Sequence, residues 1–255
     1  LLPIPDQAVG QGVVGALWQL SEQPMTEPEA LLPLLLPLLK HPGPRVRLVA
    51  AMALEHLADD TASTVAKALL PLLESPDEEV KGGVVSALGR LGRGVAPMVV
   101  PALLPLLKDT SSRLRHHAID AVTQLCLGDP DVLGREVLPL LQNSNIEVKC
   151  GALQILEQMG RAAAPYVREM RPLLRDEHRD AKRGAVVALV AIGPQAVPYI
   201  PEILPLLKSS DAGLRLFGAY AIEGLSPYDR SYLKELLPLF KDSDECVIST
   251  AVMAL

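Results

Sequence analysis

The most constraining feature of the sequence is a leucine-rich phrase that returns at a nearly constant interval. Its first copy reads LPLLK and covers Leu36–Lys40, with a proline in the second place. Successive prolines are separated by 34, 34, 34, 33, 33 and 33 residues, and they are Pro37, Pro71, Pro105, Pro139, Pro172, Pro205 and Pro238. Self-similarity at such a period is typical of arrays in which each repeat is one small unit that stacks on its neighbours.

A second pattern accompanies every copy of the phrase. Nine residues after each proline stands an apolar residue, and in six of the seven copies a basic residue comes next. Further apolar residues follow at helical spacing, as in Val80, Val84, Ala87, Leu88 and Leu91. This spacing places them on one face of an α-helix. No segment has the alternation of a β-strand, so we predict an all-α protein with two helices in each repeat.

Glycines and prolines indicate where these helices begin and end. Gly92, Gly160 and Gly193 each close a second helix, because glycine tolerates the left-handed conformation beyond a helix C-terminus. Each is followed five residues later by a proline, Pro97, Pro165 or Pro198, and proline suits the first turn of a helix. We also expect Pro101 and Pro201 in a first turn. The later proline of LPLLK removes a helical N–H, which costs about 3 kcal/mol in a helix interior. We therefore expect each first helix to be kinked or restarted at that proline.

Two long stretches resemble the HEAT repeat, a repeat built from a helical hairpin. They are VPALLPLLKDTSSRLRHHAIDAVTQL (Val100–Leu125) and LLPLLLPLLKHPGPRVRLVAAMALEHLA (Leu31–Ala58), with prolines in the first helix and an apolar–arginine pair opening the second. The sequence patterns of tetratricopeptide and ankyrin repeats are absent. The resemblance implies an α-solenoid of HEAT-like hairpins that forms a right-handed superhelix, with second helices along its concave side.

The resemblance covers nearly the whole chain, so we predict a single HEAT-repeat solenoid over residues 1–255. A partial unit at 1–25 would precede seven units at about 26–58, 62–92, 96–127, 130–160, 164–193, 197–225 and 229–255. Because the pattern stops in mid-repeat, we expect the chain to be a fragment of a longer protein.

The basic residue that opens each second helix has two interpretations. It could belong to a stripe that binds phosphates or acidic partners, or it could pair with an acid of the turn in its own or the next repeat. Asp109 with Arg115, and Asp176 with Lys182, have the spacing for such pairs. In HEAT proteins the corresponding Asp and Arg form a ladder, and we favour this interpretation. Exposed pairs contribute about 0–1 kcal/mol each, so such a ladder would align the repeats more than hold them together.

One face of the second helix varies between repeats while its surroundings stay constant. It consists of the second, sixth and ninth residues after the apolar residue that opens the helix, and we call it the variable face. Variation within a constant frame is where a solenoid can carry partner specificity. We predict partner-binding residues on this face: Trp18, Met52, Glu55, His116, Asp120, Gln154, Glu157, Arg183, Tyr220 and Glu223. The two aromatic residues stand out because such residues often anchor interfaces, although ordinary packing is the alternative for both.

Composition and motifs argue against several classes of protein. A net charge of −6 and an aromatic content of 3% disfavour binding to nucleic acid. No run of 18 uncharged apolar residues is present, so we predict no membrane span. Cys126, Cys150 and Cys246 form no CxxC pair, which indicates buried thiols in a reducing compartment. HExxH, GxSxG and Walker motifs are absent, and we predict no catalytic residues, no metal and no cofactor.

These observations favour a non-enzymatic protein-protein interaction scaffold. We expect it to bind protein partners as a component of a multi-protein complex, in the cytoplasm. The resemblance leaves two alternatives open, a HEAT-like lyase or enzyme accessory subunit, and a tubulin- or cytoskeleton-binding array of the TOG type. A TOG array would carry basic turns, whereas turns such as SPDEE and DSDEC are acidic.

Overall fold

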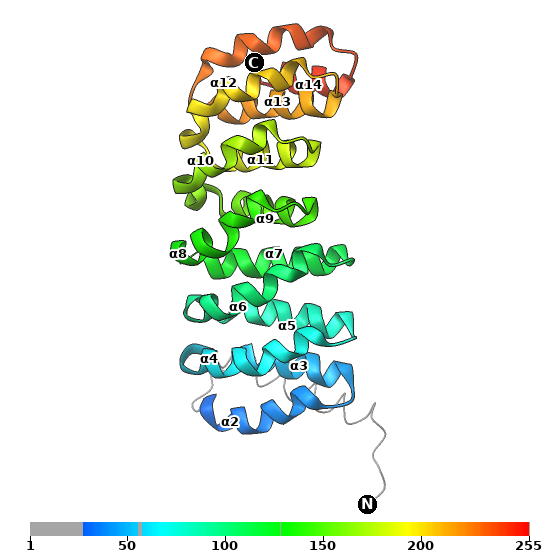
Figure 1. The fold of residues 1–255 in the computed structure, drawn as a ribbon, viewed down its shortest axis with the longest axis vertical. Coiled ribbons are helices and arrows are strands. Elements are labelled where there is room, and N and C mark those ends of the chain that lie inside the picture. The colour runs from blue at the N-terminus through cyan, green and yellow to red at the C-terminus, as the bar shows by residue number, and fades with distance from the viewer. Residues whose placement is uncertain (1–27, 56–57, 128, 255) are drawn as a thin grey trace, which may run out of the picture. The chain divides into compact units, whose positions relative to one another are not determined.

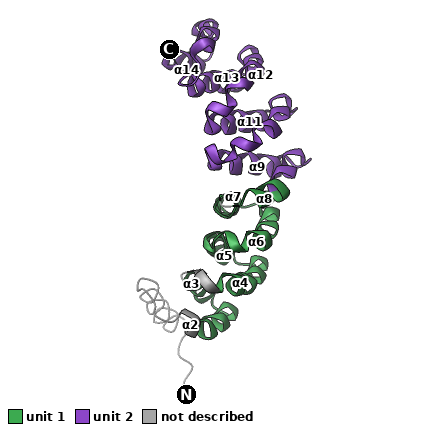
Figure 2. Cartoon of the chain, turned by 90° about the vertical axis from the view of Figure 1, so that its left-hand side faces the viewer, with its two compact units in different colours: residues 1–136 green, residues 137–255 purple. Residues whose placement is uncertain are grey.

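The computed structural model describes residues 28–55, 58–127 and 129–254, and every regular element in this part of the chain is a helix (Figure 1). The chain divides into two compact units, unit 1 over Leu1–Glu136 and unit 2 over Val137–Leu255 (Figure 2). The predicted all-α class is confirmed. A single solenoid over residues 1–255 and the handedness of its superhelix stay predictions.

The described part of unit 1 alternates short first helices with longer second helices. Its elements in chain order are α2 (Pro28–Leu35), η1 (Leu36–Lys40), α3 (Pro44–Glu55), α4 (Ala58–Leu69), η2 (Leu70–Glu74), α5 (Glu78–Arg90), η3 (Arg93–Val95), α6 (Ala96–Leu103), η4 (Leu104–Lys108), α7 (Ser112–Cys126) and α8 (Pro130–Val132). A π-helical turn, η5 (Leu133–Val137), ends one residue inside unit 2.

Unit 2 has the same alternation. Its elements are η6 (Leu138–Gln142), α9 (Ile146–Met159), η7 (Gly160–Tyr166), α10 (Val167–Met170), η8 (Arg171–Arg175), α11 (Arg179–Ile192), η9 (Pro194–Tyr199), α12 (Ile200–Ile203), η10 (Leu204–Lys208), α13 (Ala212–Leu225), η11 (Arg230–Lys241) and α14 (Glu245–Met253).

Each copy of the LPLLK phrase forms a 3₁₀ helix, and the last copy lies inside the longer η11. In the shorter copies the proline occupies the first turn of this helix, where its missing N–H would have no intrahelical partner in any case. The predicted restart of the first helix is thus confirmed. Pro97 and Pro201 lie in the first turns of α6 and α12, as predicted. The same prediction is wrong for Pro101, which lies inside α6, and for Pro165 and Pro198, which lie inside η7 and η9.

The turn between the two helices is held by the same pair of hydrogen bonds in every hairpin. The backbone N–H of Asp109 donates to the carbonyl of Leu106 at 3.0 Å, and its Oδ1 accepts from the N–H of Ser111 at 2.9 Å. The place therefore requires a short side-chain acceptor rather than one residue type. It is filled by His41, Ser75, Asp109, Asn143, Asp176, Ser209 and Asp242.

The apolar face of each second helix forms the core of its unit. In α9, Val148, Ala152, Ile155, Leu156 and Met159 are all buried, as their spacing predicts. Successive second helices pack against each other, α3 on α5 and α5 on α7 in unit 1, and α9 on α11, α11 on α13 and α13 on α14 in unit 2. Burial of each large aliphatic side chain stabilises the fold by about 1.5–3 kcal/mol.

Glycine permits a close approach of two of these helices in unit 1. A Cβ atom at Gly89 of α5 would lie 2.7 Å from both Cα and Cβ of Ala121 in α7. Because Cα belongs to the backbone, the clash cannot be relieved by a rotamer change. Glycine has a different role at the helix ends, where Gly92, Gly160 and Gly193 have φ of 83°, 52° and 83°. The predicted positive φ is confirmed, but their ψ values of 170°, −124° and −128° lie outside the left-handed helical region, in a region open to glycine alone.

The three cysteines are free thiols in different surroundings. Cys126 is buried, and this burial, with the nearby negative charges of Asp129 and Glu136, raises the pKa of its thiol to about 12. Cys150 is half-buried, and burial raises the pKa of its thiol to about 11. Cys246 is exposed. The expectation of buried thiols is therefore right for Cys126 and wrong for Cys246.

Candidate functional site

The variable face is interrupted in the described part of unit 1. Met52 is half-buried on α3, while Trp18 and the side chain of Glu55 lie outside the described residues. On α5 this face contains Gly82 and Gly89, which are buried. Substituting a side chain at either glycine would bring it against α7, so this helix offers little here for a partner to bind.

The two predicted residues on α7 are accessible but stand apart from Met52. His116 and Asp120 are both exposed, and the Nδ1 atom of His116 lies 2.6 Å from the carbonyl oxygen of Ser112. The glycine-bearing surface of α5 lies between α3 and α7. The predicted residues of unit 1 therefore do not converge.

Unit 2 brings the remaining five predicted residues onto three successive helices. Because α9 packs on α11 and α11 on α13, their variable faces are neighbours. Tyr220 is 39% exposed and Arg183 is also exposed, whereas the other three are half-buried. These three are Gln154, Glu157 and Glu223. A cation, an aromatic ring and two carboxylates thus come from adjacent helices.

A cation–π contact links two of these helices. The guanidinium carbon of Arg183, which is exposed, lies 5.8 Å from the centre of the half-buried Phe217 ring, so the contact joins α11 to α13. An exposed contact of this kind contributes about 0.5–1 kcal/mol. Sequence reasoning missed Phe217 because it lies one residue beside the variable face. Its rarity was the available signal, since the chain has only two phenylalanines.

Glu157 is the residue of this face with the clearest electrostatic perturbation. Burial raises the pKa of its carboxyl group, and the nearby positive charge of Arg183 acts in the opposite direction. The carboxylate of Glu157 is thus partly shielded from water beside the exposed guanidinium of Arg183.

The basic residues at the starts of the second helices bind within the array. Arg47, Arg115 and Arg215 each donate through Nη1 to two carbonyl oxygens of their own turn, at 2.7–3.2 Å. Arg115 thus bonds the backbone carbonyl of Asp109, so the predicted pairing with its carboxylate is wrong in that detail. These contacts hold the guanidinium groups against the turns.

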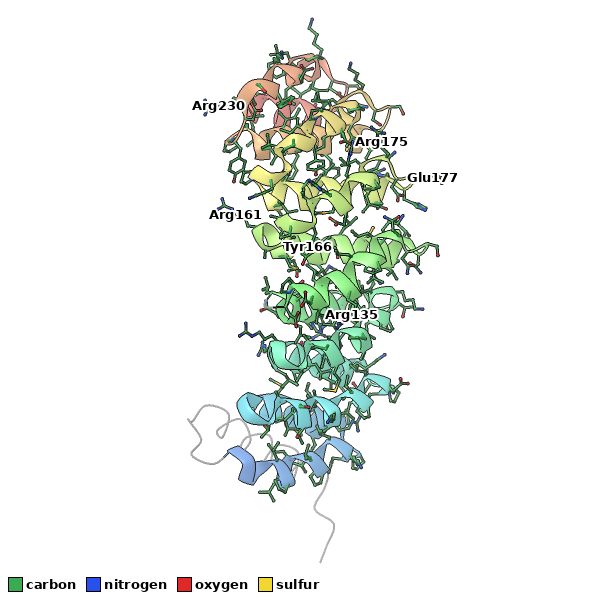
Figure 3. The ribbon with its side chains drawn as sticks, turned by 60° about the vertical axis from the view of Figure 1, so that its left-hand side comes forward. Arg135, Arg161, Tyr166, Arg175, Glu177 and Arg230 are labelled. Atoms are coloured by element: carbon green, nitrogen blue, oxygen red, sulfur yellow. The ribbon has the colours of Figure 1, made fainter. Side chains whose placement is uncertain are left out.

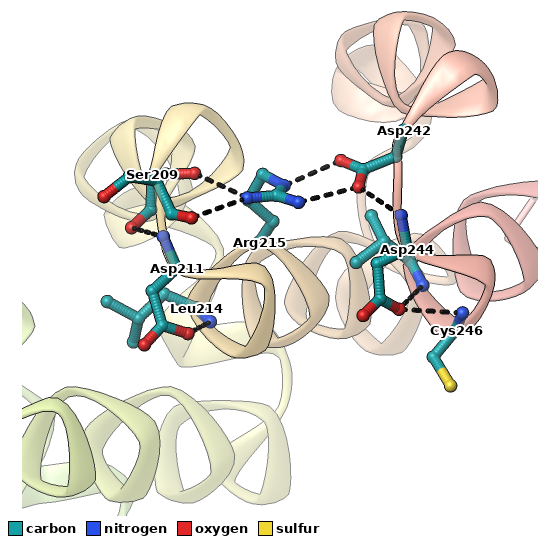
Figure 4. Close-up of polar contacts among 9 residues, drawn as sticks. Ser209, Asp211, Leu214, Arg215, Asp242, Asp244 and Cys246 are labelled. Carbon is teal, nitrogen blue, oxygen red and sulfur yellow. Dashed lines mark hydrogen bonds and ion pairs between the residues drawn. The ribbon is translucent and has the colours of Figure 1, made fainter.

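Ion pairs to the next hairpin confirm the predicted ladder in unit 2. Nε and Nη2 of Arg215 both lie 2.7 Å from carboxylate oxygens of Asp242, 27 residues later (Figure 4). Lys149 pairs in the same way with Asp176, which therefore does not pair with Lys182 as its own-repeat spacing suggested. Hydrogen bonds from Arg215 hold the pKa of Asp242 below its usual value. The basic residues of these pairs are structural rather than open to a ligand.

A small hollow lies between α5 and α7. It has a volume of about 20 Å³, which suits a single water molecule. Its lining includes His117, whose Nδ1 atom is buried without a hydrogen-bond partner in the described part of the chain. Sites for small-molecule ligands are usually about 300–1,000 Å³, so this hollow is too small for a substrate.

Among the residues that the structure describes, no cluster of three or more His, Cys, Asp or Glu side chains is arranged to hold a metal ion. No single helix there is long and apolar enough to cross a membrane, and α5 passes that test only together with Arg93–Lys108, at a bend of 107°.

Comparison with known proteins identifies the class to which this architecture belongs. Two models of the HEAT repeat family match, one to residues 31–60 and one to residues 66–135. The segments 31–60 and 66–135 thus match HEAT repeats, and the fold is of the α-solenoid class, built from helical hairpins.

Two solved structures show the same fold over almost the whole chain. A crystal structure of importin β matches with a TM-score of 0.61 and 13% identity, covering 99% of this chain and 38% of that one. A crystal structure of a Kap121p mutant matches with a TM-score of 0.62 and 18% identity, covering 98% of this chain and 31% of that one. The chain thus spans about a third of the length of these structures. A search of curated protein sequences found no significant match.

Proposed function

We propose that this protein is a non-enzymatic scaffold that binds a protein partner through the variable face of unit 2. The observation that carries the proposal is the arrangement of Arg183 over Phe217, with the exposed ring of Tyr220 on the same helix as Phe217. Tyrosine and arginine are the residue types most enriched among the energetic anchors of protein interfaces. HEAT solenoids typically act without catalysis, by presenting an extended surface.

The charges on this face indicate how such a partner would bind. Glu157 and Glu223 lie on the outer two of three adjacent helices, with Arg183 on the middle helix. Opposite charges so arranged select a partner with the complementary order of charges and repel others. A place in a multi-protein complex, and an intracellular location suggested by the three free cysteines, belong to the same proposal.

The test is affinity purification of the full chain from its native cells, compared with a charge-reversed variant. The variant combines Glu157→Lys, Arg183→Glu and Glu223→Lys, and should lose a partner that the unaltered chain retains. A control with Lys108→Glu and Lys208→Glu changes exposed residues at the ends of two 3₁₀ helices, and should retain that partner. Retention of every partner by the triple variant would refute the proposal.

The same preparation separates this proposal from its enzymatic alternative. A lyase or other cofactor-dependent enzyme would carry a bound chromophore, which an absorbance spectrum would reveal. No observation on the described residues favours either a lyase or a tubulin-binding array, so we propose neither.

A further inference from the structure

The aromatic residues of the chain are concentrated in one of its two units. The sequence contains five tyrosines, two phenylalanines and one tryptophan, and all except Trp18 lie after residue 136. Unit 2 therefore holds every tyrosine of the protein. The variable face accounts for only part of this concentration.

Three of the tyrosines recur with the period of the hairpins. Tyr166, Tyr199 and Tyr232 are separated by 33 residues, and they lie at the end of η7, at the end of η9 and in the first turn of η11. All three are half-buried. The same place in unit 1 holds aliphatic residues with 0% exposure: Val65, Val99 and Leu133. Unit 2 thus has a row of partly exposed tyrosines at the positions where unit 1 has fully buried aliphatic side chains.

A fourth tyrosine connects the hairpins along the same edge. Tyr228 is 44% exposed, and its hydroxyl oxygen lies 3.4 Å from Nη2 of Arg161, 67 residues earlier. A Cβ atom at Gly193 would lie 3.2 Å from this hydroxyl, so the phenol ring rests over the intervening connection. The connections that follow α9, α11 and α13 therefore form one continuous surface, which we call the tyrosine edge. It comprises Arg161, Tyr166, Tyr199, Tyr228, Arg230 and Tyr232.

The tyrosine edge carries positive charge that the fold leaves available. Arg161 and Arg230 are exposed, and within the described part of the chain neither has a carboxylate at ion-pairing distance. The carboxylate of Asp229 caps η11 by accepting from the N–H of Ser231 at 2.9 Å. In Figure 3 the two arginines project from one edge of unit 2, while Arg175 and Glu177 lie at the opposite edge.

The repeat geometry determines the shape of a ligand that could follow this row. Packed helices lie about 8–10 Å apart, so equivalent residues of successive hairpins are separated by a similar distance. An extended chain advances about 3.3 Å per residue, and a polyproline II helix about 3.1 Å, so three residues cover about 9–10 Å. An extended segment laid along the hairpins would therefore place every third residue near a tyrosine.

We propose that the tyrosine edge of unit 2 binds an extended acidic peptide segment of a partner protein. Every third residue of the segment packs on Tyr166, Tyr199 or Tyr232, and its carboxylates pair with Arg161 and Arg230. Tyrosine suits this role because its ring offers apolar contact, and because the hydroxyls of Tyr199 and Tyr232 can donate to a peptide carbonyl. This surface is separate from the variable face, so the proposal does not depend on the function proposed above.

The test is fluorescence anisotropy with the full chain at low salt. The probe is a fluorescein-labelled peptide of four Glu-Pro-Leu repeats, which is extended, acidic and periodic in three. It should bind at least about tenfold more tightly than a peptide of four Lys-Pro-Leu repeats, and its binding should weaken as salt is raised. Equal affinities for the two peptides would overturn the proposal. A peptide of the same composition in scrambled order should bind more weakly. Equal binding of the scrambled peptide would overturn the proposal that every third residue contacts a tyrosine.

Matched variants locate the binding on the tyrosine edge. Arg161→Glu combined with Arg230→Glu should weaken binding of the Glu-Pro-Leu probe at least about tenfold, with an unchanged circular dichroism spectrum. The control is Arg93→Glu, because Arg93 is exposed and follows Gly92 in unit 1 as Arg161 follows Gly160 in unit 2. A loss as large in the control, or no loss in the double variant, would refute the assignment. If the double variant misfolds, Tyr199→Ala should weaken the same probe.

Discussion

Replacing Gly89 by alanine tests the close approach of α5 and α7. The new Cβ would lie 2.7 Å from Cα and Cβ of Ala121. Carbon atoms in favourable contact are about 3.5–4.0 Å apart, so the overlap is about 1 Å. Neither obstacle is the end of a flexible side chain, and the two helices must therefore separate.

The expected effect of Gly89→Ala is a difference between two opposing contributions. Overpacking a well-packed core costs about 1–3 kcal/mol. Alanine is favoured over glycine within a helix by about 1 kcal/mol, which offsets part of this cost. We expect a net loss of up to about 2 kcal/mol in the free energy of unfolding. Without the close approach the sign would reverse, because the helix-propensity gain alone would remain.

The measurement is urea unfolding followed by circular dichroism, with hydrogen exchange to locate the change in α5 and α7. Tyrosine fluorescence would not report this change, since every tyrosine lies in unit 2. The matched control is Gly94→Ala, where no atom lies within 4 Å of the new Cβ, and its effect should stay within about 0.5 kcal/mol. A Gly89→Ala variant that is more stable than the unaltered chain would refute the packing argument.

Three further predictions concern the ladder, the thiols and the prolines. Asp242→Asn keeps a turn acceptor but removes the charge that pairs with Arg215. The pKa of Asp242 is lowered in the folded chain, so its stabilisation is present above about pH 4 and is lost as pH falls further. The difference in unfolding free energy between the two proteins should therefore shrink in acid. A difference that stays constant with pH would contradict this. A thiol reagent at pH 8 should modify, in order of decreasing rate, Cys246, Cys150 and Cys126, and rapid modification of the buried thiol in the folded chain would argue against the structure. Pro101→Ala should raise the urea midpoint, because it restores an N–H inside α6. Pro105→Ala should lower stability by about 0.5–1 kcal/mol, because Pro105 lies in the first turn of η4. Stability changes of the same sign in both variants would contradict these two placements.

Periodicity in the sequence was sufficient to predict the hairpins, their core faces and the break at each repeated proline. These features depend on local rules, because apolar spacing selects a helical face and proline cannot continue an α-helix. The same rules predicted that Gly160 and Gly193 end helices, and both have positive φ. They placed Pro101 wrongly because the start of α6 is set by Pro97, which is closer to the preceding glycine.

Contacts between repeats were harder to predict from the sequence. Arg115 binds a backbone carbonyl, an acceptor that every residue provides and that no sequence pattern distinguishes. For the candidate site, spacing placed Arg183 and Tyr220 on adjacent helices, but it did not predict the contact of Arg183 with Phe217 or the interruption of the face at Gly82. Both features depend on the distance between neighbouring helices. The periodic tyrosines could have been found by aligning the repeats. The sequence could not show that their side chains are partly exposed.

The shared use of Asp242 has a consequence for how the array comes apart. Its Oδ1 accepts from the N–H of Asp244 in its own turn and from Nη2 of Arg215 in the preceding hairpin, so one carboxylate joins the local order of a hairpin to that of its neighbour. In a linear array, such nearest-neighbour coupling determines how far a melted segment spreads before it stops. At the equivalent position of the preceding turn stands Ser209. Its hydroxyl accepts the hydrogen bond of its own turn from the N–H of Asp211, but it carries no charge that could pair with Lys182 of the preceding hairpin. The charged link between these two hairpins comes instead from Arg179, which pairs with Asp211 of the same turn at 3.1 Å. An ion pair therefore joins each successive pair of second helices in unit 2, and we expect the unit to unfold as one cooperative segment rather than to pause at this serine.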